Sequence, residues 1–138
     1  MNTLNHIAFI MDGNGRWGLK KKRSRNYGHL EGVKTVQKIV EASILYKIPT
    51  ISFYVFSTEN WKRPKSEINY LFNLINVYFK KEINNIIEKK IKINILGRLK
   101  KLPTKISKNL LAVVKKTKKN KKLIVNLAIN YGSKDEII

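Results

Sequence analysis

The sequence alternates short apolar runs with longer segments whose apolar residues recur at helical spacing. The short runs are rich in β-branched and aromatic residues and predict strands, at residues 6–11, 50–56, 91–97 and 123–129. The longer segments predict helices, at residues 28–46, at residues 66–90 with Ser66 as the cap, and from Pro103 onward. Strands that alternate with helices predict an α/β fold: a mostly parallel sheet with helices on both faces.

The length of the chain bounds its organisation. Its 138 residues suffice for one domain with one core, so residues 1–138 are expected to form a single domain. The final segment "NYGSKDEII" only begins a further loop and helix. We therefore expect the fold to be incomplete at its C-terminal end, with an apolar edge or face of the sheet left uncovered.

Three polar loops follow predicted strands: "DGNGRW", "STENWKR" and "NYG". Because the carboxyl ends of parallel strands meet at one edge of a sheet, we expect these loops to converge there. Ligands of such sheets bind at that edge, so the loops are the first place to look for a site.

The first loop contains Gly13, Gly15 and Gly18 in the spacing G-x-G-x-x-G, which is typical of dinucleotide binding. That interpretation requires a helix directly after the glycines and an acidic residue at the end of the second strand. The predicted helix begins only near Gly28, and Phe56-Ser57-Thr58 ends the second strand. No Gly-Lys-Ser/Thr follows either, so a P-loop is excluded.

Asp12, directly before these glycines, indicates a metal-assisted phosphate site. A carboxylate beside a phosphate-binding loop repels a diphosphate unless a cation lies between them, and Mg²⁺ binds through one or two carboxylates plus substrate phosphates. The residues expected to hold the remaining oxygens are Arg16, Arg25, His29 and Arg63. A simple turn aspartate is the alternative.

The two tryptophans of the chain, Trp17 and Trp61, lie in the loops rather than in the core-forming runs. Loop tryptophans beside arginines often line a site, although a core role is the usual one for this residue. Glu59 and Asn60 precede Trp61 and are either turn residues or groups that orient a ligand and handle a proton.

The charge balance is strongly basic: 29 Lys and Arg against 9 Asp and Glu, a net charge of +20. Such a charge favours anionic partners and keeps a rival hypothesis open, a non-catalytic basic nucleic-acid-binding module. The excess is mostly lysine spread over the chain, so no nucleic-acid partner is expected. There is no cysteine, no signal peptide and no apolar run long enough to span a bilayer, which predicts a cytoplasmic location.

Four motifs in order resemble those of the cis-prenyltransferases, the undecaprenyl diphosphate synthase type of isoprenyl transferase. They are "HIAFIMDGNGRW", "RNYGHLEG", "YVFSTENWKRP" and "NLAINYG", and the resemblance runs from His6 to the C-terminus. The resemblance implies condensation of an allylic diphosphate with isopentenyl diphosphate to a cis-polyprenyl diphosphate, with release of pyrophosphate. It also implies Mg²⁺, a homodimer in the complete family member, and contact with a membrane surface through the polyprenyl product.

The resemblance implies roles residue by residue. Asp12 is the catalytic, Mg²⁺-linked aspartate and Asn60 the proton acceptor. The substrate-binding residues it implies are Gly13, Asn14, Gly15, Arg16, Trp17, Arg25, His29, Ser57, Thr58, Glu59, Trp61 and Arg63.

The chain departs from the family pattern near its C-terminus. The family carries a motif R-x-S-x-F-x-x-W and a second Mg²⁺-linked glutamate, which grip isopentenyl diphosphate, and neither occurs here. Three interpretations stay open: a fragment, one part of a split enzyme, or a half-site that only binds. In each of them this polypeptide is expected to be inactive alone.

Overall fold

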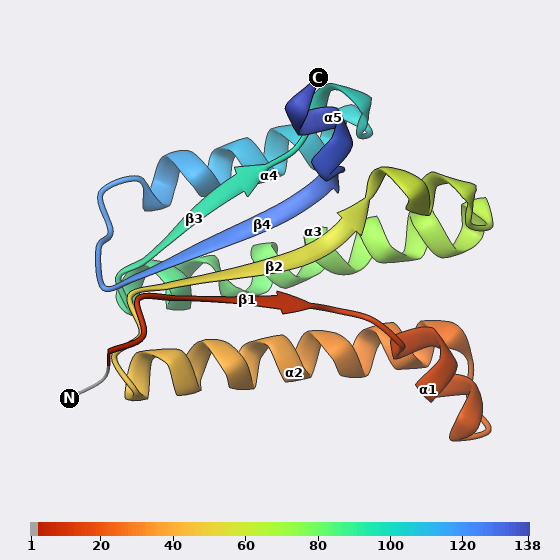
Figure 1. The fold of residues 1–138 in the computed structure, drawn as a ribbon, viewed down its shortest axis with the longest axis horizontal. Helices are drawn as coiled ribbons and strands as arrows, with labels where there is room; N and C mark the ends of the chain where they lie inside the picture. Colours follow the sequence, from red (N-terminus) through yellow and green to blue (C-terminus); the bar gives the residue numbers. More distant parts are fainter. Residues whose placement is uncertain (1–2) are drawn as a thin grey trace.

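The structure is a computed structural model that describes residues 3–138 as a parallel sheet with helices packed against it (Figure 1). The alternation predicted from the sequence is confirmed: strands and helices follow one another along the chain. The elements are β1 (His6–Ile10), α1 (Asn14–Lys20), α2 (Arg25–Leu45), β2 (Thr50–Ser57), η1 (Thr58–Lys62), α3 (Lys65–Glu88), β3 (Ile91–Leu96), η2 (Leu99–Lys101), α4 (Thr104–Thr117), β4 (Leu123–Tyr131) and α5 (Ser133–Ile137).

The strand order of the sheet is β1-β2-β4-β3, and every neighbouring pair is parallel. The register aligns Ile51 of β2 with Ile7 of β1 on one side and with Val125 of β4 on the other. Phe53, two residues further along β2, stacks on Phe9 with ring centroids 5.3 Å apart. Alternate residues of the strands thus form one continuous apolar face, which is the sheet's contribution to the core.

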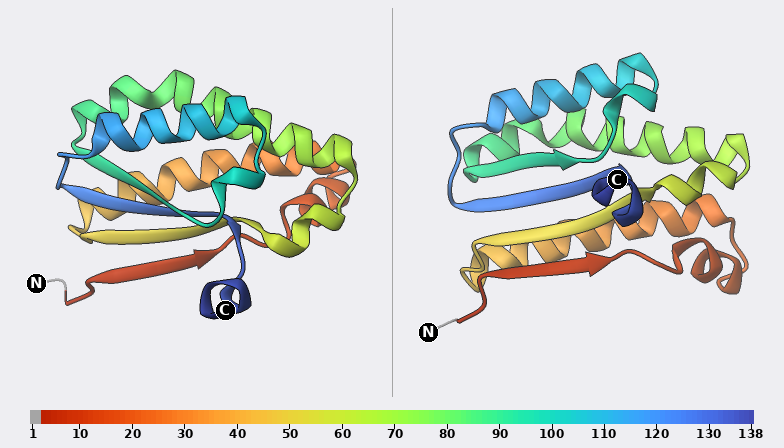
Figure 2. Two further views of the ribbon diagram at one scale, coloured as in Figure 1. Left: turned by 90° about the horizontal axis from the view of Figure 1, so that it is seen from above. Right: turned by 45° about the horizontal axis from the view of Figure 1, so that its top comes forward.

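The helices are distributed unevenly over the two faces. Figure 2 shows α2, α3 and α4 on the same face, and α5 on the other side of the sheet. Phe72 and Phe79 of α3 and Leu110 of α4 are buried in the core that this helical layer forms with the sheet. The α/β class is therefore confirmed, and five-residue α5 is the helical element on the second face in the described part of the chain.

The second face carries a row of hydrogen-bonded polar side chains across the sheet. His6 Nε2 lies 2.7 Å from Ser52 Oγ, which also accepts a hydrogen bond from Asn126 Nδ2 at 3.1 Å. Asn94 Nδ2 donates to Asn126 Oδ1 at 3.1 Å. The middle of this face is therefore polar, whereas the sequence led us to expect an apolar edge or face left uncovered. Ile10, nearer the carboxyl edge, is exposed as expected.

Helix α1 was not predicted, because the sequence indicated no helix between the first strand and Gly28. The helix begins after Gly13, whose φ of 87° lies in the left-handed region that glycine adopts without strain. It packs tightly on α2, because a Cβ at Gly18 would lie 2.8 Å from the backbone nitrogen of Gly28 and overlap the carbonyl of Ser24. Gly18 thus serves helix packing, a requirement that the local sequence pattern does not reveal.

Two helix starts also differ from the prediction. Helix α2 begins at Arg25, because the Ser24 hydroxyl accepts a hydrogen bond from the Tyr27 backbone N–H at 3.0 Å. Helix α3 is preceded by Pro64, whose carbonyl accepts from the nitrogens of Glu67 and Ile68, so Ser66 is not its cap. No helix among residues 3–138 combines the length and the apolar character needed to span a bilayer.

Candidate functional site

A cleft of about 440 Å³ opens at the carboxyl edge of the sheet, between the β1–α1 segment, α2, η1 and α3. The convergence of the first two polar loops that the sequence predicted is confirmed here. The predicted site residues that line the cleft are Asp12, Gly13, Asn14, Gly15, Arg16, Arg25, His29, Ser57, Asn60 and Arg63.

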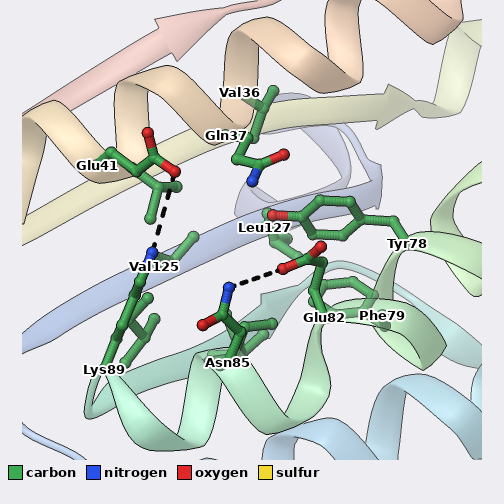
Figure 3. A pocket seen from close by; sticks show the side chains of 14 residues that line it. Val36, Gln37, Glu41, Tyr78, Phe79, Glu82, Asn85, Lys89, Val125 and Leu127 are labelled. Atoms are coloured by element: carbon green, nitrogen blue, oxygen red, sulfur yellow. Dashed lines mark hydrogen bonds and ion pairs between the residues drawn. The ribbon is translucent and has the colours of Figure 1, made fainter.

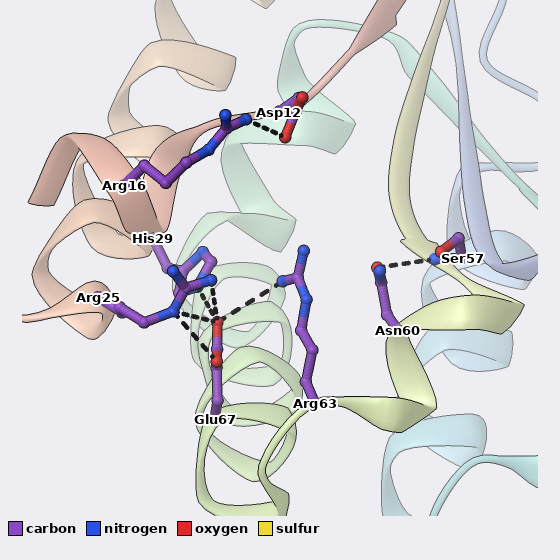
Figure 4. A network of polar contacts seen from close by, with 8 residues as sticks. All are labelled: Asp12, Arg16, Arg25, His29, Ser57, Asn60, Arg63 and Glu67. Carbon is purple, nitrogen blue, oxygen red and sulfur yellow. Dashed lines mark hydrogen bonds and ion pairs between the residues drawn. The ribbon is translucent and has the colours of Figure 1, made fainter.

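Glu67, in the first turn of α3, holds the basic side chains of the cleft together (Figure 4). Arg25 donates to both of its carboxylate oxygens, from Nε at 3.2 and 3.3 Å and from Nη2 at 3.2 Å. His29 Nε2 lies 2.8 Å from Oε1, and Arg63 Nη1 forms an ion pair with the same oxygen at 3.6 Å. One carboxylate of α3 therefore organises two guanidinium groups and an imidazole from two other segments, α2 and the end of η1.

The side chain of Glu67 is only 8% exposed. Burial alone would raise its pKa, but the hydrogen bonds from His29 and Arg25 outweigh burial and hold the pKa below its ordinary value. Because an ionised carboxylate can only accept hydrogen bonds, His29 Nε2 is the protonated donor in the hydrogen bond between His29 and Glu67.

The local charge at this end of the cleft is positive. Arg25 and Arg63 bring two permanent positive charges against the one negative charge of Glu67. The contacts with Glu67 use the Nε and Nη2 edge of Arg25, and the planar guanidinium has its Nη1 on the opposite side. The cluster thus has one positive charge more than the Glu67 carboxylate neutralises. This excess charge suits a second anionic group, bound in the cleft.

Asp12 and Arg16 form an exposed ion pair at 3.1 Å on the opposite side of the cleft (Figure 4). Both side chains are more than 70% exposed, at 73% and 71%, so the pair is held weakly. Among residues 3–138 no group of three or more His, Cys, Asp or Glu side chains is arranged to hold a metal ion. Asp12 is a single carboxylate, which suits a Mg²⁺ ion whose other ligands are substrate phosphates and water.

Asn60 is fixed by a capping box at the start of η1. Its side-chain Oδ1 accepts from the Ser57 backbone N–H at 3.1 Å, and the Ser57 side chain accepts from the Asn60 backbone. Both residues line the cleft, Ser57 at the end of β2 and Asn60 in η1. The capping box therefore orients the amide of Asn60.

The remaining predicted site residues lie away from the lining of the cleft. Trp17 stacks on Tyr27, with ring centroids 5.9 Å apart. Trp61 packs edge-on against Phe56 and Phe72, and its Nε1 donates to Asn130 at 2.8 Å. The structure places two further predicted residues beside Trp61 in η1, outside the lining: Thr58 and exposed Glu59.

The inner end of the cleft is apolar. Four residues line both the cleft and a second cavity of about 80 Å³ between the sheet and the two helices: Leu74 and Ile75 of α3, Val33 of α2 and Val55 of β2. This second cavity is lined by apolar side chains, with Tyr78 as its only hydroxyl among the described residues. An anion at the basic end would thus have an apolar passage directly behind it.

A third cavity of about 50 Å³ continues the passage between α2 and α3 (Figure 3). It shares Val36, Tyr78 and Phe79 with the second cavity, and polar groups lie at its far end. There the Lys89 ammonium pairs with Glu41 at 3.9 Å, and Asn85 donates to Glu82 at 3.1 Å. Burial, aided by the charges of Glu82 and Glu41, raises the pKa of Tyr78 to about 12, so its hydroxyl stays neutral.

Sequence reasoning missed Glu67. The available signal was its spacing, four residues after Arg63 and in the first turn of a helix, where acidic side chains are favoured. That spacing predicts at most a local pair. Its contacts with Arg25 and His29 cross about forty residues of chain and appear only in the folded protein.

The sequence matches the family model described as "Putative undecaprenyl diphosphate synthase" over residues 10–138. It is 46% identical over 133 residues to the isoprenyl transferase of Halalkalibacterium halodurans, covering 96% of this chain and 52% of that protein. It is 44% identical over 137 residues to that of Clostridium tetani, covering 99% and 54%. The chain thus spans about half the length of the curated relatives it matches.

Two solved structures have the same fold. A probable undecaprenyl diphosphate synthase from Campylobacter jejuni matches with a TM-score of 0.80 and 37% identity, covering 99% of this chain and 59% of that one. Lavandulyl diphosphate synthase from Lavandula x intermedia, solved in complex with dimethylallyl diphosphate, matches with a TM-score of 0.93. At 23% identity, over 98% of this chain and 58% of that one, the second likeness concerns the fold alone.

Proposed function

Because this chain belongs to the undecaprenyl diphosphate synthase family, we propose that its cleft binds the allylic diphosphate of a cis-prenyl transfer reaction. In that reaction the allylic C–O bond to pyrophosphate breaks and a new C–C bond forms to isopentenyl diphosphate. A proton leaves the isopentenyl carbon, and the product is a longer cis-polyprenyl diphosphate.

The observation that carries the proposal is the pairing of a basic cluster with an apolar passage. Arg25, His29 and Arg63 surround Glu67 at one end of the cleft, and the cavity behind Leu74 is apolar. An allylic diphosphate has the matching asymmetry, an anionic head and a hydrocarbon tail. The polar contacts would fix the head, and burial of the tail would contribute about 25 cal/mol per Å² of apolar surface.

The guanidinium groups have a role in the reaction as well as in binding. Negative charge on the diphosphate grows as its bond to carbon breaks, so Arg16, Arg25 and Arg63 stabilise the transition state more than the bound substrate. Because Glu67 holds Arg25 and Arg63 in position beforehand, little reorganisation is needed during the reaction.

Mg²⁺ fits this site at Asp12, next to the glycine segment that would approach the phosphates. When bound, the ion would neutralise negative charge shared between the Asp12 carboxylate and the diphosphate. Arg16 would exchange its weak contact with Asp12 for a phosphate oxygen. Gly13, Asn14 and Gly15 line the cleft at the same place and let the backbone come close to those oxygens.

Asn60 is proposed to receive the proton or to orient the group that does. Its Oδ1 is already held by the Ser57 N–H, which keeps the amide pointing to the cleft from η1. A neutral amide is a weak base, so the step would end with the proton on pyrophosphate or water. Thr58, Glu59, Trp61 and Trp17 are proposed as surrounding groups that shape the site.

The sequence lacks the motif R-x-S-x-F-x-x-W, to which the family resemblance assigns the binding of isopentenyl diphosphate. We therefore propose that this polypeptide binds the allylic substrate but does not catalyse transfer alone. A second polypeptide or further sequence would supply the other site, and the homodimer of the complete family member belongs to the same proposal.

Calorimetric titration with farnesyl diphosphate tests the proposal. Binding is expected to strengthen when Mg²⁺ is added and to be lost in Arg25→Ala, while Lys118→Ala, on the exposed end of α4, binds normally. Equal binding by Arg25→Ala would contradict the proposed site. Formation of a longer polyprenyl diphosphate from isopentenyl diphosphate by the purified chain would contradict the proposed inactivity.

A further inference from the structure

The corner between α1 and α2 combines exposed apolar side chains with consecutive positive charges. Trp17 is 41% exposed and Leu19 is 54% exposed, although both are large apolar residues. Four exposed basic residues follow in sequence: Lys20 at the end of α1, then Lys21, Lys22 and Arg23 in the turn. We call these six residues the basic corner.

Contacts within the basic corner and with the neighbouring Tyr27 hold its aromatic and basic groups together. The ring of Trp17 stacks nearly parallel to Tyr27, at an interplanar angle of 12°. Lys21 Nζ lies 5.8 Å from the centre of the Trp17 ring, and Arg23 Cζ lies 5.6 Å from that of Tyr27. A fixed indole flanked by cations is suited to the boundary between water and lipid, where tryptophan and basic side chains gather.

The basic corner also lies at the same edge of the sheet as the cleft. It follows β1, so it lies at the carboxyl edge of the sheet, and Arg16 of the cleft precedes it by one residue (Figure 1). The other dense group of lysines, Lys118, Lys119 and Lys121, precedes β4 and therefore lies at the amino edge. That second group has charge but no tryptophan beside it.

We propose that the basic corner docks the protein on an anionic lipid bilayer, with Trp17 and Leu19 at the depth of the headgroups and the lysines on the lipid phosphates. Each basic residue near such a surface strengthens the attraction to the lipid phosphates, and the apolar side chains add to this. Charge alone would equally suit a nucleic acid, but a nucleic acid would leave Leu19 without a role.

Docking in this way would place the cleft next to the bilayer, which suits a product with a long hydrocarbon tail. That consequence depends on the proposed function, whereas the docking itself does not. Vesicle binding is therefore measured without substrate, so its failure and the failure of prenyl transfer are told apart.

The experiment is co-sedimentation with vesicles of phosphatidylglycerol and phosphatidylcholine, and with vesicles of phosphatidylcholine alone, at physiological ionic strength. Two triple variants remove the same charge: Lys20, Lys21 and Lys22 to Gln in the basic corner, and Lys118, Lys119 and Lys121 to Gln at the opposite edge. The first is expected to weaken binding to the anionic vesicles by roughly 100-fold and the second by only a few-fold. Leu19→Gln is expected to weaken it by roughly tenfold.

A second measurement follows Trp17 directly. In Trp61→Phe it is the only remaining tryptophan, and its emission should shift to the blue when anionic vesicles are added. If that variant does not fold, quenching of the tryptophan fluorescence of the unmodified protein by brominated lipid gives the same information. This quenching should be weaker in Leu19→Gln. Equal losses in the two triple variants, or normal binding by Leu19→Gln, would overturn the proposal and indicate a general attraction of a polycation to anions, nucleic acids included.

Discussion

Glu67 Oε1 lies 2.8 Å from His29 Nε2, a buried contact between residues 38 positions apart in the sequence. The same carboxylate is shared with Arg25 and Arg63. It brings the start of α2 and the end of η1 to a common point on α3. The arrangement of the basic groups in the cleft therefore depends on this one carboxylate.

Glu67→Gln is expected to reduce the free energy of unfolding by about 2 kcal/mol, because it weakens the hydrogen bonds to charged partners in a buried position. Urea denaturation monitored by circular dichroism measures the change. Glu88→Gln, exposed at the end of the same helix, is the control and should change stability by less than about 0.5 kcal/mol. Equal stability of the two variants would contradict the structural role of Glu67.

The stability of the protein should depend on the ionisation of Glu67. Its pKa is lowered in the folded state from the ordinary value of 4.5, so the unfolded chain binds the proton more readily. The contribution of Glu67 is therefore fully present above that ordinary value and is lost as the pH falls through the lower, folded pKa. Urea denaturation over the acid range should show this loss in the wild type. The same part of the pH dependence should be absent from Glu67→Gln.

Arg25→Lys tests whether geometry, rather than charge alone, matters in the cleft. Lysine keeps the positive charge but cannot reproduce the two-pronged contact of Arg25 with Glu67 while also offering a donor to a phosphate. We expect farnesyl diphosphate to bind at least roughly tenfold more weakly in calorimetry. Arg98→Lys, beside η2 and outside the cleft, should leave the affinity as it is.

Gly15→Ala should reduce diphosphate binding through a steric effect on Arg25. A Cβ at position 15 would lie 2.6 Å from Cζ of Arg25, so the guanidinium must move out of its contact with Glu67. Weaker farnesyl diphosphate binding is expected, with the helical circular dichroism signal retained. Lys20→Ala, exposed on the same helix, is the control, and identical affinities in the two variants would show that Arg25 has no fixed position.

The apolar passage can be tested with two substrates that share a head and differ in the length of the tail. Val36 lines both inner cavities, so Val36→Trp should obstruct the passage beyond the cleft. Affinity for farnesyl diphosphate should fall, while that for the shorter dimethylallyl diphosphate should persist. Persistent binding of the shorter substrate also demonstrates that the variant folds.

The control for this obstruction is Val77→Trp on the exposed side of α3. It should bind both substrates as the wild type does. Normal binding of farnesyl diphosphate by Val36→Trp would mean that the tail follows another route.

The sequence determined the α/β class, the convergence of two polar loops at the carboxyl edge, and most of the polar residues that line the cleft. Those features follow from local signals: hydrophobic periodicity identifies the strands and helices, and the polar residues directly after parallel strands are brought to one edge. Asp12, Arg25, His29 and Arg63 were predicted in this way, and all line the cleft. Their roles in substrate binding and catalysis remain predictions.

The tertiary structure decided what local signals do not encode. The single-sided helical layer, the packing of Gly18 against α2, and the passage from the cleft to Tyr78 depend on how distant elements meet. Glu67 is the clearest example, since its sequence neighbours suggest only a pair with Arg63. Its position under the cleft results from α2 and α3 packing on the same face of the sheet, because that arrangement brings the first turns of both helices together.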